Sequence, residues 1–319
     1  MNKKRALITG ITGFAGSHLA ELLLNEKVEV HGILRWRSKM ENIEKIEDKI
    51  KLYEADLLDA HSLYKVIDEI QPDYIFHLAA QSYVQSSWSS PSNTIEINVI
   101  GTVNIFEAVK KSGLPIAIQI ACSSEEYGRV LADELPITEN NPLRPLSPYA
   151  VSKLAMDYLG YQYWESYGMR IIRTRGFNHT GPRRGDVFAE STFARQIAEI
   201  EKGKRKPQVL VGNLNARRDY TDVRDMVRAY YLSVQKCKSG QVYNIATGTS
   251  WKIGDVLDLL LSKSKVKIKI VEDKARMRPS DVEVLVGDAS KFMAETGWQP
   301  KIPFEKTLVD LLDFWREKV

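Results

Sequence analysis

The sequence predicts an α/β fold, in which a doubly wound parallel sheet with helices on both faces is followed by a smaller C-terminal α/β lobe. Short apolar runs alternate with helical periodicity up to residue 246, which is the pattern of successive strand, helix and strand units. A glycine-rich turn joins the first apolar run directly to the first helix. From Trp251 onward the order changes to helix, strand and terminal helix, which indicates a second, smaller unit.

The first strand and helix predict a dinucleotide site. Residues 5–9 form an apolar strand, and Gly10, Gly13 and Gly16 follow it at the start of a helix whose leucines share one face. Such a turn lets the backbone approach a pyrophosphate and directs unpaired amides of the helix N-terminus at it. The spacing is G-x-x-G-x-x-G and not the commoner G-x-G-x-x-G, but its place is the one that a Rossmann-type motif requires. The alternative is a tight turn that binds nothing.

The end of the second strand predicts the choice of nucleotide. Residues 28–34 are followed by Arg35-Trp36-Arg37-Ser38, where an NAD enzyme would carry an acid that binds the ribose 2′-hydroxyl. Two guanidinium groups and no acid fit a 2′-phosphate, so we expect NADP. The alternative is a solvated basic loop.

The later elements continue the alternation. Strands are expected at residues 50–54, 74–78, 116–121, 170–174 and 242–246, and helices at residues 62–70, 94–112, 147–167 and 223–234. Asp222 caps the last of these helices, and core packing explains its apolar stripe, which includes Tyr230 and Tyr231. The helix at 94–112 is apolar on more than one side, so we expect one side to pack on the sheet and another on a partner subunit.

The second lobe is expected to be assembled from separate parts of the chain. It holds a helix at residues 253–261, a strand at 266–270 and a terminal helix at 304–318. We expect residues 1–176 and 215–248 to form the NADP-binding domain, and residues 177–214 and 249–319 to form the smaller, substrate-binding lobe.

Tyr149 and Lys153 predict a proton-transfer site. They are four residues apart in a segment that begins as a helix at Ser147 and Pro148, so they lie on one helix face. The ammonium group can then stabilise the phenolate of a group that is otherwise a poor base at neutral pH. Ser123, just beyond the strand at 116–121, adds a hydroxyl at the edge where open α/β sheets bind ligands. The alternative is a chance pair on a helix surface.

Composition restricts the class of protein. The 319 residues are 44% hydrophobic, with no apolar run of membrane-spanning length, so we expect a cytoplasmic globular protein without a membrane partner. The net charge of +4 is mild and its basic residues are dispersed, so nucleic acid is not expected. Cys122 and Cys237 are too few for a disulfide framework or a metal site, and we interpret both as buried.

Taken together, these features resemble the extended short-chain dehydrogenases/reductases that act on nucleotide sugars. Within that superfamily the chain most resembles the GDP-mannose 4,6-dehydratases and the related GDP-6-deoxy-4-keto-hexose reductases. The resemblance covers nearly the whole chain and is carried by Gly10-Ile-Thr-Gly13, Val30-His31-Gly32-Ile33-Leu34-Arg35, Ala80-Gln81-Ser82, Phe177-Asn178-His179, Pro182-Arg183-Arg184-Gly185, Gly212-Asn213-Leu214, Arg217-Arg218-Asp219 and Arg278-Pro279.

The resemblance implies a role for each residue of the site. Ser123 would hydrogen-bond the C4 oxygen of the sugar, Glu125 would remove the C5 proton, and Tyr149 with Lys153 would be the phenol and its lysine. The residues expected to contact NADP include those of the glycine turn. They are Gly10, Thr12, Gly13, Phe14, Gly16, Arg35, Asp56, Leu57, Leu78, Ala80, Gln81, Ser82, Tyr149, Lys153, His179 and Arg184. Contacts to the GDP-sugar are expected from Ser82, Ser124, Asn178, Arg218 and Arg278.

The expected function is that of a GDP-mannose 4,6-dehydratase, a lyase that forms GDP-4-keto-6-deoxy-mannose and recycles its NADP. The alternatives are an NADPH-dependent GDP-6-deoxy-4-keto-hexose reductase of the GDP-rhamnose-forming type, a GDP-heptose 4,6-dehydratase, and a non-catalytic NADP-binding module. Phe14-Ala15 and Thr180-Gly181 depart from the usual dehydratase pattern, and Arg276-Met-Arg278-Pro279 and Thr296-Gly297-Trp298 resemble the reductases. By contrast, Arg183-Arg184-Gly185 and Gln81-Ser82 resemble the dehydratases. We expect a homodimer or homotetramer formed through the helices at 94–112 and 147–167.

Overall fold

A seven-stranded parallel sheet forms the larger part of the computed structural model, which describes residues 3–277 and 282–319. The strand order is β10-β6-β5-β4-β1-β2-β3. The strands are β1 (Arg5–Thr9), β2 (Glu29–Leu34), β3 (Lys51–Glu54), β4 (Tyr74–His77), β5 (Ala117–Ser123), β6 (Ile171–Gly176) and β10 (Val242–Ile245). Because all seven run in parallel, their carboxyl ends meet at one edge of the sheet, as the sequence predicts.

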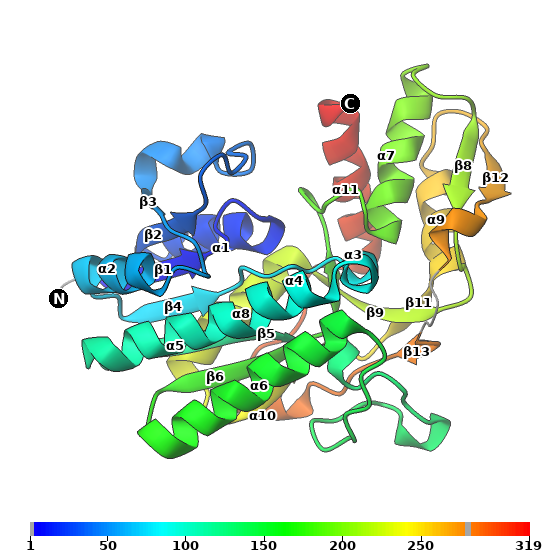
Figure 1. Ribbon diagram of the computed structural model, residues 1–319. Helices are drawn as coiled ribbons and strands as arrows, with labels where there is room; N and C mark the ends of the chain where they lie inside the picture. Colours follow the sequence, from blue (N-terminus) through cyan, green and yellow to red (C-terminus); the bar gives the residue numbers. More distant parts are fainter. Residues whose placement is uncertain (1–2, 278–281) are drawn as a thin grey trace.

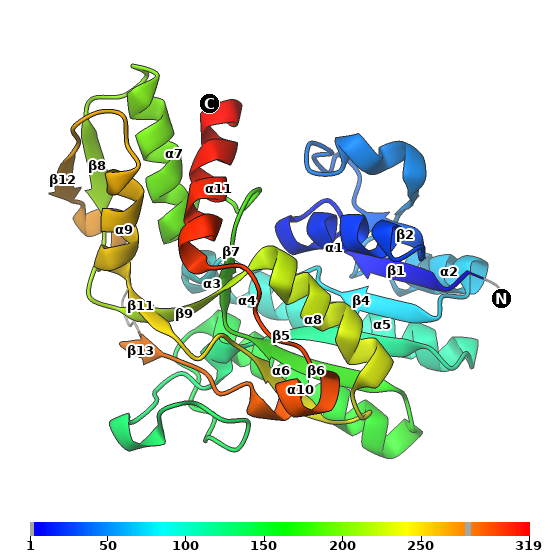
Figure 2. The ribbon, with the colours of Figure 1, turned by 180° about the vertical axis from the view of Figure 1, so that it is seen from behind.

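Helices cover both faces of this sheet (Figures 1 and 2). One face carries α2 (Ala60–Ile70), α5 (Gly101–Ser112) and α6 (Pro148–Tyr167), and the other carries α1 (Phe14–Asn25), α8 (Val223–Lys236) and α10 (Ser290–Thr296). Each face has its own buried apolar cluster, because the central strands are apolar on both sides. The predicted doubly wound parallel sheet is confirmed. In the described part of the chain, no helix combines the length and the apolar character needed to span a bilayer.

The segment expected as one helix at residues 94–112 has an irregular middle. Short helices α3 (Val84–Ser89) and α4 (Pro91–Ile95) precede a π-helical turn, η2 (Glu96–Ile100), which continues into α5. Asn98 lies buried in this π turn, where its side chain accepts from the Gln81 amide and donates to the hydroxyl of Ser152 on α6. The wider turn therefore points an amide side chain at the start of the helix that carries Tyr149.

A second set of strands and helices forms the smaller lobe. One sheet joins β11 (Ser250–Lys252), β9 (Arg217–Asp222), β13 (Val284–Leu285) and β7 (Asn178–Thr180), and another joins β8 (Gln208–Val211) to β12 (Lys269–Glu272). The helices α7 (Ala189–Glu201), α9 (Ile253–Ser262) and α11 (Phe304–Lys318) pack around an apolar cluster of their own. Residues 215–248 therefore divide between the two units, because β9 belongs to the second sheet whereas α8 and β10 belong to the first.

Several bounds differ from those expected. The strand expected at residues 266–270 is formed by Lys269–Glu272, and α7 was not expected at all. The strand expected to end at residue 121 continues to Ser123, so this serine is the last residue of β5. The terminal helix has the expected bounds.

The buried carboxylate of Asp219 ties β9 to two loops. It accepts hydrogen bonds from the backbone and hydroxyl of Thr247 and from the amides of Gly248 and Gly287, at 2.7 to 3.3 Å. Thr247 and Gly248 follow β10 of the first sheet, and Gly287 follows β13 of the second. One side chain thus accepts four hydrogen bonds at the junction of the two units.

We predict that Asp219→Asn lowers the free energy of unfolding by about 2 to 4 kcal/mol, because the new NH₂ group faces backbone donors and leaves buried N–H groups without acceptors. Urea denaturation of the purified protein measures the change. The control is Asp313→Asn, whose carboxylate is 54% exposed and pairs only with Arg316. An equal effect of the two substitutions would contradict the role assigned to Asp219.

Candidate active site

A cavity of about 650 Å³ lies at the carboxyl edge of the seven-stranded sheet. It contains residues from β2, β5 and β6, from the turns that follow β1 and β4, from helices α1, α6 and α8, and from β7 and β9 of the smaller lobe. Every described residue for which the sequence predicts a catalytic, cofactor or sugar contact lines this cavity. Arg278, the remaining predicted contact, lies outside the described residues.

The glycine-rich turn forms one end of the cavity and has no room for side chains. Gly10 has a φ of +74°, and a Cβ there would lie 3.0 Å from the Cα of Ala79. A Cβ on Gly16 would lie 2.2 Å from the carbonyl oxygen of Gly10. The backbone therefore borders the cavity directly at the N-terminus of α1, where N–H groups have no partner within the helix.

Aromatic and cationic groups connect this turn to the smaller lobe. The ring of Phe14 stacks on that of His179, with centroids 5.9 Å apart and an angle of 6° between the planes. The guanidinium of Arg184 lies 5.1 Å from the Phe14 ring and 3.4 Å from the Phe188 ring. Burial lowers the pKa of His179 to about 4, and the charge of Arg184 acts in the same direction. His179 is therefore neutral near pH 7.

Ser123, Tyr149 and Lys153 meet at the other end of the cavity. The helix that carries the last two begins as predicted, with Pro148 in its first turn and the Ser147 hydroxyl accepting from the Ala150 amide at 3.1 Å. Lys153 Nζ donates to the Ala121 carbonyl at 2.7 Å and lies 5.9 Å from the centroid of the Tyr149 ring.

Burial is the main influence on the protonation of Tyr149 and Lys153. Burial raises the pKa of Tyr149, whereas the Ser123 hydroxyl, as a hydrogen-bond partner, acts to lower it. Burial also lowers the pKa of Lys153. The predicted one-face arrangement of phenol and ammonium is present, but the protein groups alone leave the phenol protonated at neutral pH.

Two adjacent glutamates after β5 have different surroundings. Both lie in the short helix η3 (Ser124–Glu126), which follows Ser123. The Glu125 side chain lines the cavity, and its carboxylate has neither a hydrogen bond nor an ion pair with any described residue. Glu126 is fully buried, accepts from the Ser123 amide at 2.8 Å and lies 3.2 Å from the guanidinium of Arg175. Of the two carboxylates, that of Glu125 is free to react.

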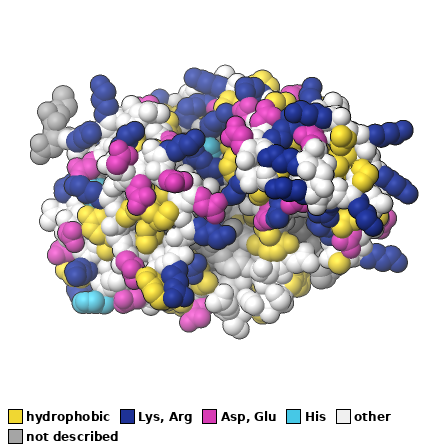
Figure 3. All heavy atoms as spheres, turned by 90° about the horizontal axis from the view of Figure 1, so that it is seen from above, with side chains coloured by type: hydrophobic (Ala, Val, Ile, Leu, Met, Phe, Trp, Pro, Cys, Tyr) yellow, Lys and Arg dark blue, Asp and Glu magenta, His cyan; other side chains and the backbone are white. Residues whose placement is uncertain are grey.

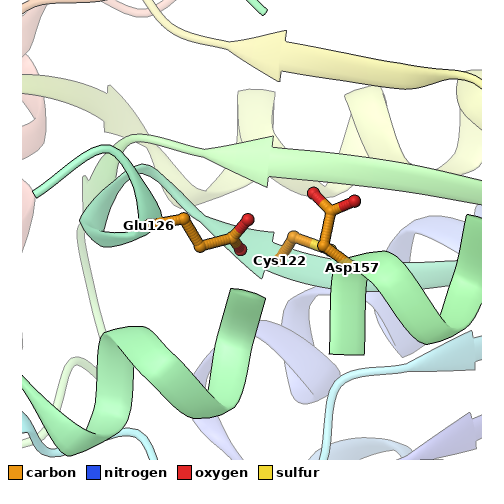
Figure 4. Close-up of side chains that lie close together, drawn as sticks. All are labelled: Cys122, Glu126 and Asp157. Carbon is orange, nitrogen blue, oxygen red and sulfur yellow. The ribbon is translucent and has the colours of Figure 1, made fainter. Parts of the chain in front are cut away.

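Cys122, Glu126 and Asp157 form a buried cluster of groups that can bind metal ions (Figure 4). Positive charge is already supplied there, because Arg175 Nε lies 2.7 Å from Asp157 and 3.2 Å from Glu126, and Arg173 also pairs with Asp157. Burial raises the pKa of the Cys122 thiol, so the sulfur stays protonated. We interpret the cluster as an ion-pair network that holds β5, β6 and α6 together.

Comparison with known proteins identifies the family. A family model described as GDP-mannose 4,6 dehydratase matches residues 7–311. The chain belongs to this family. The GDP-mannose 4,6-dehydratase of Vibrio cholerae serotype O1 is 34% identical over 353 aligned residues, covering 98% of the chain and 93% of the relative. The GDP-6-deoxy-D-mannose reductase of Pseudomonas aeruginosa is 33% identical over 316 residues, covering 99% of the chain and 98% of the relative.

The solved structures agree with this assignment. The structure of RMD from Pseudomonas aeruginosa complexed with NADPH matches with a TM-score of 0.85 and 33% identity, covering 99% of this chain and 100% of that one. The expected resemblance to the GDP-mannose 4,6-dehydratase family is therefore confirmed. Because a dehydratase and a reductase are almost equally similar, the family alone leaves both reactions open.

A second, basic cavity of about 900 Å³ adjoins the first in this family member. Arg35 lines both cavities, whereas Arg37 lines only the second and stacks on the exposed ring of Trp36 at 4.1 Å. The face seen in Figure 3 carries many lysine and arginine side chains. The basic lining of the second cavity consists of Arg35, Arg37, Lys39, Arg183, Arg184, Arg195, Lys204 and Lys318.

Sequence reasoning missed two groups of the site. Tyr230 belongs to the apolar stripe of α8 and is only 2% exposed, as expected for a core residue, yet it also lines the cavity. Glu126 adjoins the predicted Glu125, but its partner Arg175 is 49 residues away in the sequence. The two phenols within the apolar stripe, Tyr230 and Tyr231, are the local signal, but the sequence does not show which of them reaches the cavity.

His77 supports the floor of the cavity in its neutral form. Thr9 Oγ1 accepts from the amides of Leu78 and Ala79, so its own proton points to His77 Nδ1 at 2.9 Å. His77 Nε2 lies 3.0 Å from Thr102 Oγ1, which donates its proton to the Asn98 carbonyl. Burial lowers the pKa of His77 to about 3. The ring therefore donates through Nε2 and accepts through Nδ1.

We predict that stability falls as the pH drops from about 6.5 towards 3, because the unfolded chain then binds a proton that the folded His77 does not. At pH 5 this residue alone costs on the order of 2 kcal/mol. In His77→Gln, the free energy of unfolding should fall less steeply as the pH drops, because close to one proton fewer is taken up on unfolding. Urea denaturation at a series of pH values measures this slope. His61→Gln, at an exposed position, is the control. An unchanged slope in His77→Gln would contradict this assignment.

Proposed function

We propose that this family member is an NADP-dependent GDP-mannose 4,6-dehydratase. The observation that carries the proposal is the carboxylate of Glu125, which has no partner among the described residues and lines the same cavity as Ser123, Tyr149 and Lys153. Tyr149, supported by Ser123 and Lys153, can take the proton of a sugar hydroxyl, and Glu125 can take a proton from the adjacent carbon. Family membership supplies the GDP-mannose substrate class. The lyase activity, the cofactor and the residue roles below are parts of this proposal.

The cavity fits a dinucleotide. The turn at Gly10 and Gly16 has no space for side chains, and it exposes amides at the N-terminus of α1 that suit a pyrophosphate. Arg35 lies at the end of β2 between the two cavities, where a guanidinium suits a 2′-phosphate. Bound NADP would supply a hydride acceptor that takes hydrogen from C4 and returns it to C6. RMD from Pseudomonas aeruginosa, whose structure holds NADPH, supports the choice of a phosphorylated cofactor.

Tyr149 is the proposed base for the C4 hydroxyl. Its phenol must lose a proton although burial raises its pKa, so groups that favour the phenolate matter. The hydroxyl of Ser123, the charge of Arg184 and the ammonium of Lys153 at 5.9 Å from the ring are such groups. Ser123 would also hold the C4 oxygen as the alcohol becomes a ketone.

Glu125 is the proposed base for the C5 proton. Once C4 is a ketone, the C5 hydrogen is acidic because the resulting carbanion is conjugated with the carbonyl. Glu125 removes this proton and then donates it to the C6 hydroxyl, which leaves as water while a double bond forms between C5 and C6. When hydride returns to C6, C5 takes up one proton, which balances the proton that Tyr149 removed from the C4 hydroxyl. Glu125 has no partner among the described residues, so it can react without breaking an ion pair. The buried Glu126 would have to leave its ion pair with Arg175, which excludes it as the base.

The smaller lobe is proposed to hold the GDP-sugar. Asn178 on β7 and Arg218 on β9 line the cavity from that side, and Ser82 and Ser124 line it from the larger unit. Arg218 is 5% exposed, and its guanidinium donates to the backbone carbonyls of Arg217 and Val282. Its orientation is thus fixed by the backbone.

We retain the proposal of a homodimer or homotetramer through the helices at 94–112 and 147–167. The outer surface of these segments carries large hydrophobic side chains that are 43% to 57% exposed. They are Ile100, Val151, Tyr158, Tyr161 and Tyr167.

A reductase is the second candidate, favoured by the almost equal similarity of a known reductase. The Pseudomonas aeruginosa reductase is 33% identical to the chain and the Vibrio cholerae dehydratase is 34% identical. A reductase would use Ser123, Tyr149 and Lys153 to protonate a C4 oxygen as hydride arrives, and would consume one NADPH per product. A dehydratase needs only catalytic NADP, so the cofactor balance separates the two reactions.

We predict that Glu125→Gln lowers the turnover of GDP-mannose to GDP-4-keto-6-deoxy-mannose by at least about 100-fold while NADP affinity stays unchanged. C4 oxidation does not need this carboxylate, so mixing the variant with GDP-mannose should leave reduced nicotinamide that the unmodified protein does not accumulate. Mass analysis for loss of water and nicotinamide absorbance measure the two effects.

Glu134→Gln provides a control, because Glu134 pairs with Arg144 and does not line the cavity. Normal water loss in Glu125→Gln would overturn the role of Glu125. An unmodified protein that makes nothing from GDP-mannose, but oxidises NADPH with a GDP-4-keto-6-deoxy-hexose, would replace the dehydratase with the reductase.

We further predict that Arg35→Ala weakens NADP binding by roughly 10-fold to more than 100-fold and NAD binding little, because a charge-assisted hydrogen bond to a phosphate contributes about 1.5 to 3 kcal/mol. Arg37→Ala is the matched control, since this side chain stacks on Trp36 and lines only the second cavity. Titration calorimetry with both nucleotides measures the effects. Equal affinity of the unmodified protein for NAD and NADP would refute the preference.

A further inference from the structure

Tyr230 brings a buried phenol to the cavity that the proposed reaction does not use. Its side chain is 2% exposed and lies with Cys122 and Gly176 on the cavity wall. Its hydroxyl has no hydrogen-bond partner among the residues that the structure describes. The hydroxyl oxygen is not one of the fully enclosed polar atoms without a partner, so it borders the cavity, and phenylalanine would fill the place of the ring in the core equally well. The core role of Tyr230 therefore explains its ring and leaves its hydroxyl unexplained.

The hydroxyl reaches the reactive end of the cavity from the opposite face of the sheet. Tyr149 comes from α6, and Tyr230 comes from α8 behind the sheet (Figures 1 and 2). Between them, β6 ends in Gly176, where a Cβ would lie 3.6 Å from the Tyr230 hydroxyl oxygen. Because this position carries no side chain, no methyl group stands beside the hydroxyl.

Neither Cys122 nor Arg184, two polar groups near Tyr230, hydrogen-bonds its hydroxyl. Cys122 keeps its proton and is a weak hydrogen-bonding group, because burial raises the pKa of its thiol. Arg184 lies against the rings of Phe14 and Phe188 and faces Glu190 at 3.6 Å. Burial also raises the pKa of Tyr230, so its hydroxyl remains a neutral donor and acceptor across the physiological range.

We propose that the Tyr230 hydroxyl binds the carboxamide of the nicotinamide ring and fixes the orientation of that ring. This inference rests on the proposed function, which brings the ring beside Ser123 and Tyr149. The carboxamide is the only hydrogen-bonding substituent of the ring, and a phenol can donate to its oxygen or accept from its NH₂ group. Tyr230 thus acts as a positioning residue, whose hydroxyl makes no hydrogen bond to the described part of the free protein and is paired in the complex.

The test uses Tyr230→Phe and two ligands, NADP and 2′-phospho-ADP-ribose, which lacks the nicotinamide. We expect the affinity for NADP to fall about 3- to 10-fold and that for 2′-phospho-ADP-ribose to stay unchanged. The melting temperature of the free variant should be equal to or above that of the unmodified protein. Tyr231→Phe is the matched control, because this neighbour packs against Tyr74 and does not line the cavity.

The outcomes separate this inference from the proposed function. Unchanged NADP affinity in Tyr230→Phe, or an equal loss for both ligands, would overturn the inference while turnover by the unmodified protein still supported the function. Failure of the unmodified protein to bind NADP would overturn both. A fall in melting temperature equal to the loss of a buried hydrogen bond would show that the hydroxyl serves the fold and would also reject the inference.

Discussion

The guanidinium of Arg175 determines the geometry of the reactive edge. It projects from β6 and binds Asp157 on α6 and Glu126 on η3, so three elements share one buried cation. Glu126 in turn accepts the amide of Ser123, and α6 carries Tyr149. Removing one partner of such a buried pair costs about 3 to 5 kcal/mol, because a charge is left without compensation. The distance between the serine and the tyrosine is thus set by groups that never touch a ligand.

The same burial creates a conflict that the site must resolve. It removes water from the phenol and the ammonium, which raises the pKa of Tyr149 and lowers that of Lys153. Both shifts favour the neutral forms, opposite to the phenolate and ammonium pair that the proposed reaction needs. The proposed reaction therefore relies on the low dielectric of the buried site. A positive charge close to the Tyr149 phenol stabilises the phenolate there much more strongly than it would in water.

The parts that sequence predicted well depend on local patterns. Strand and helix alternation gave the seven-stranded sheet, and the cap at Ser147 with the Tyr149 and Lys153 spacing gave α6 and the residues on its inner face. The family motifs predicted cavity residues in both units of the structure. Local patterns could not reveal that Asp157 and Arg175 meet, because neither residue differs from an ordinary surface charge until the fold buries it.

Tertiary context also explains the misses in secondary structure. Asn98 interrupts a regular helix because its side chain bonds both the Gln81 backbone and Ser152 on another helix. The strands β7, β9, β11 and β13 are short, and their partners lie far apart in the sequence, so periodicity is weak there. A strand such as β9 could not be assigned to a unit without its partners.

The glycine turn and the loop after β2 differ in how much change they tolerate. At Gly16 even one added carbon would clash with the Gly10 carbonyl oxygen. A change to the surface that is proposed to face the pyrophosphate would therefore also disturb the packing of β1 against α1. Arg35, Trp36 and Arg37 are exposed and contribute nothing to the buried clusters. The nucleotide preference proposed for Arg35 can therefore drift in evolution, or be re-engineered, at almost no thermodynamic cost to the scaffold, whereas the proposed dinucleotide-binding turn cannot change without disturbing the fold.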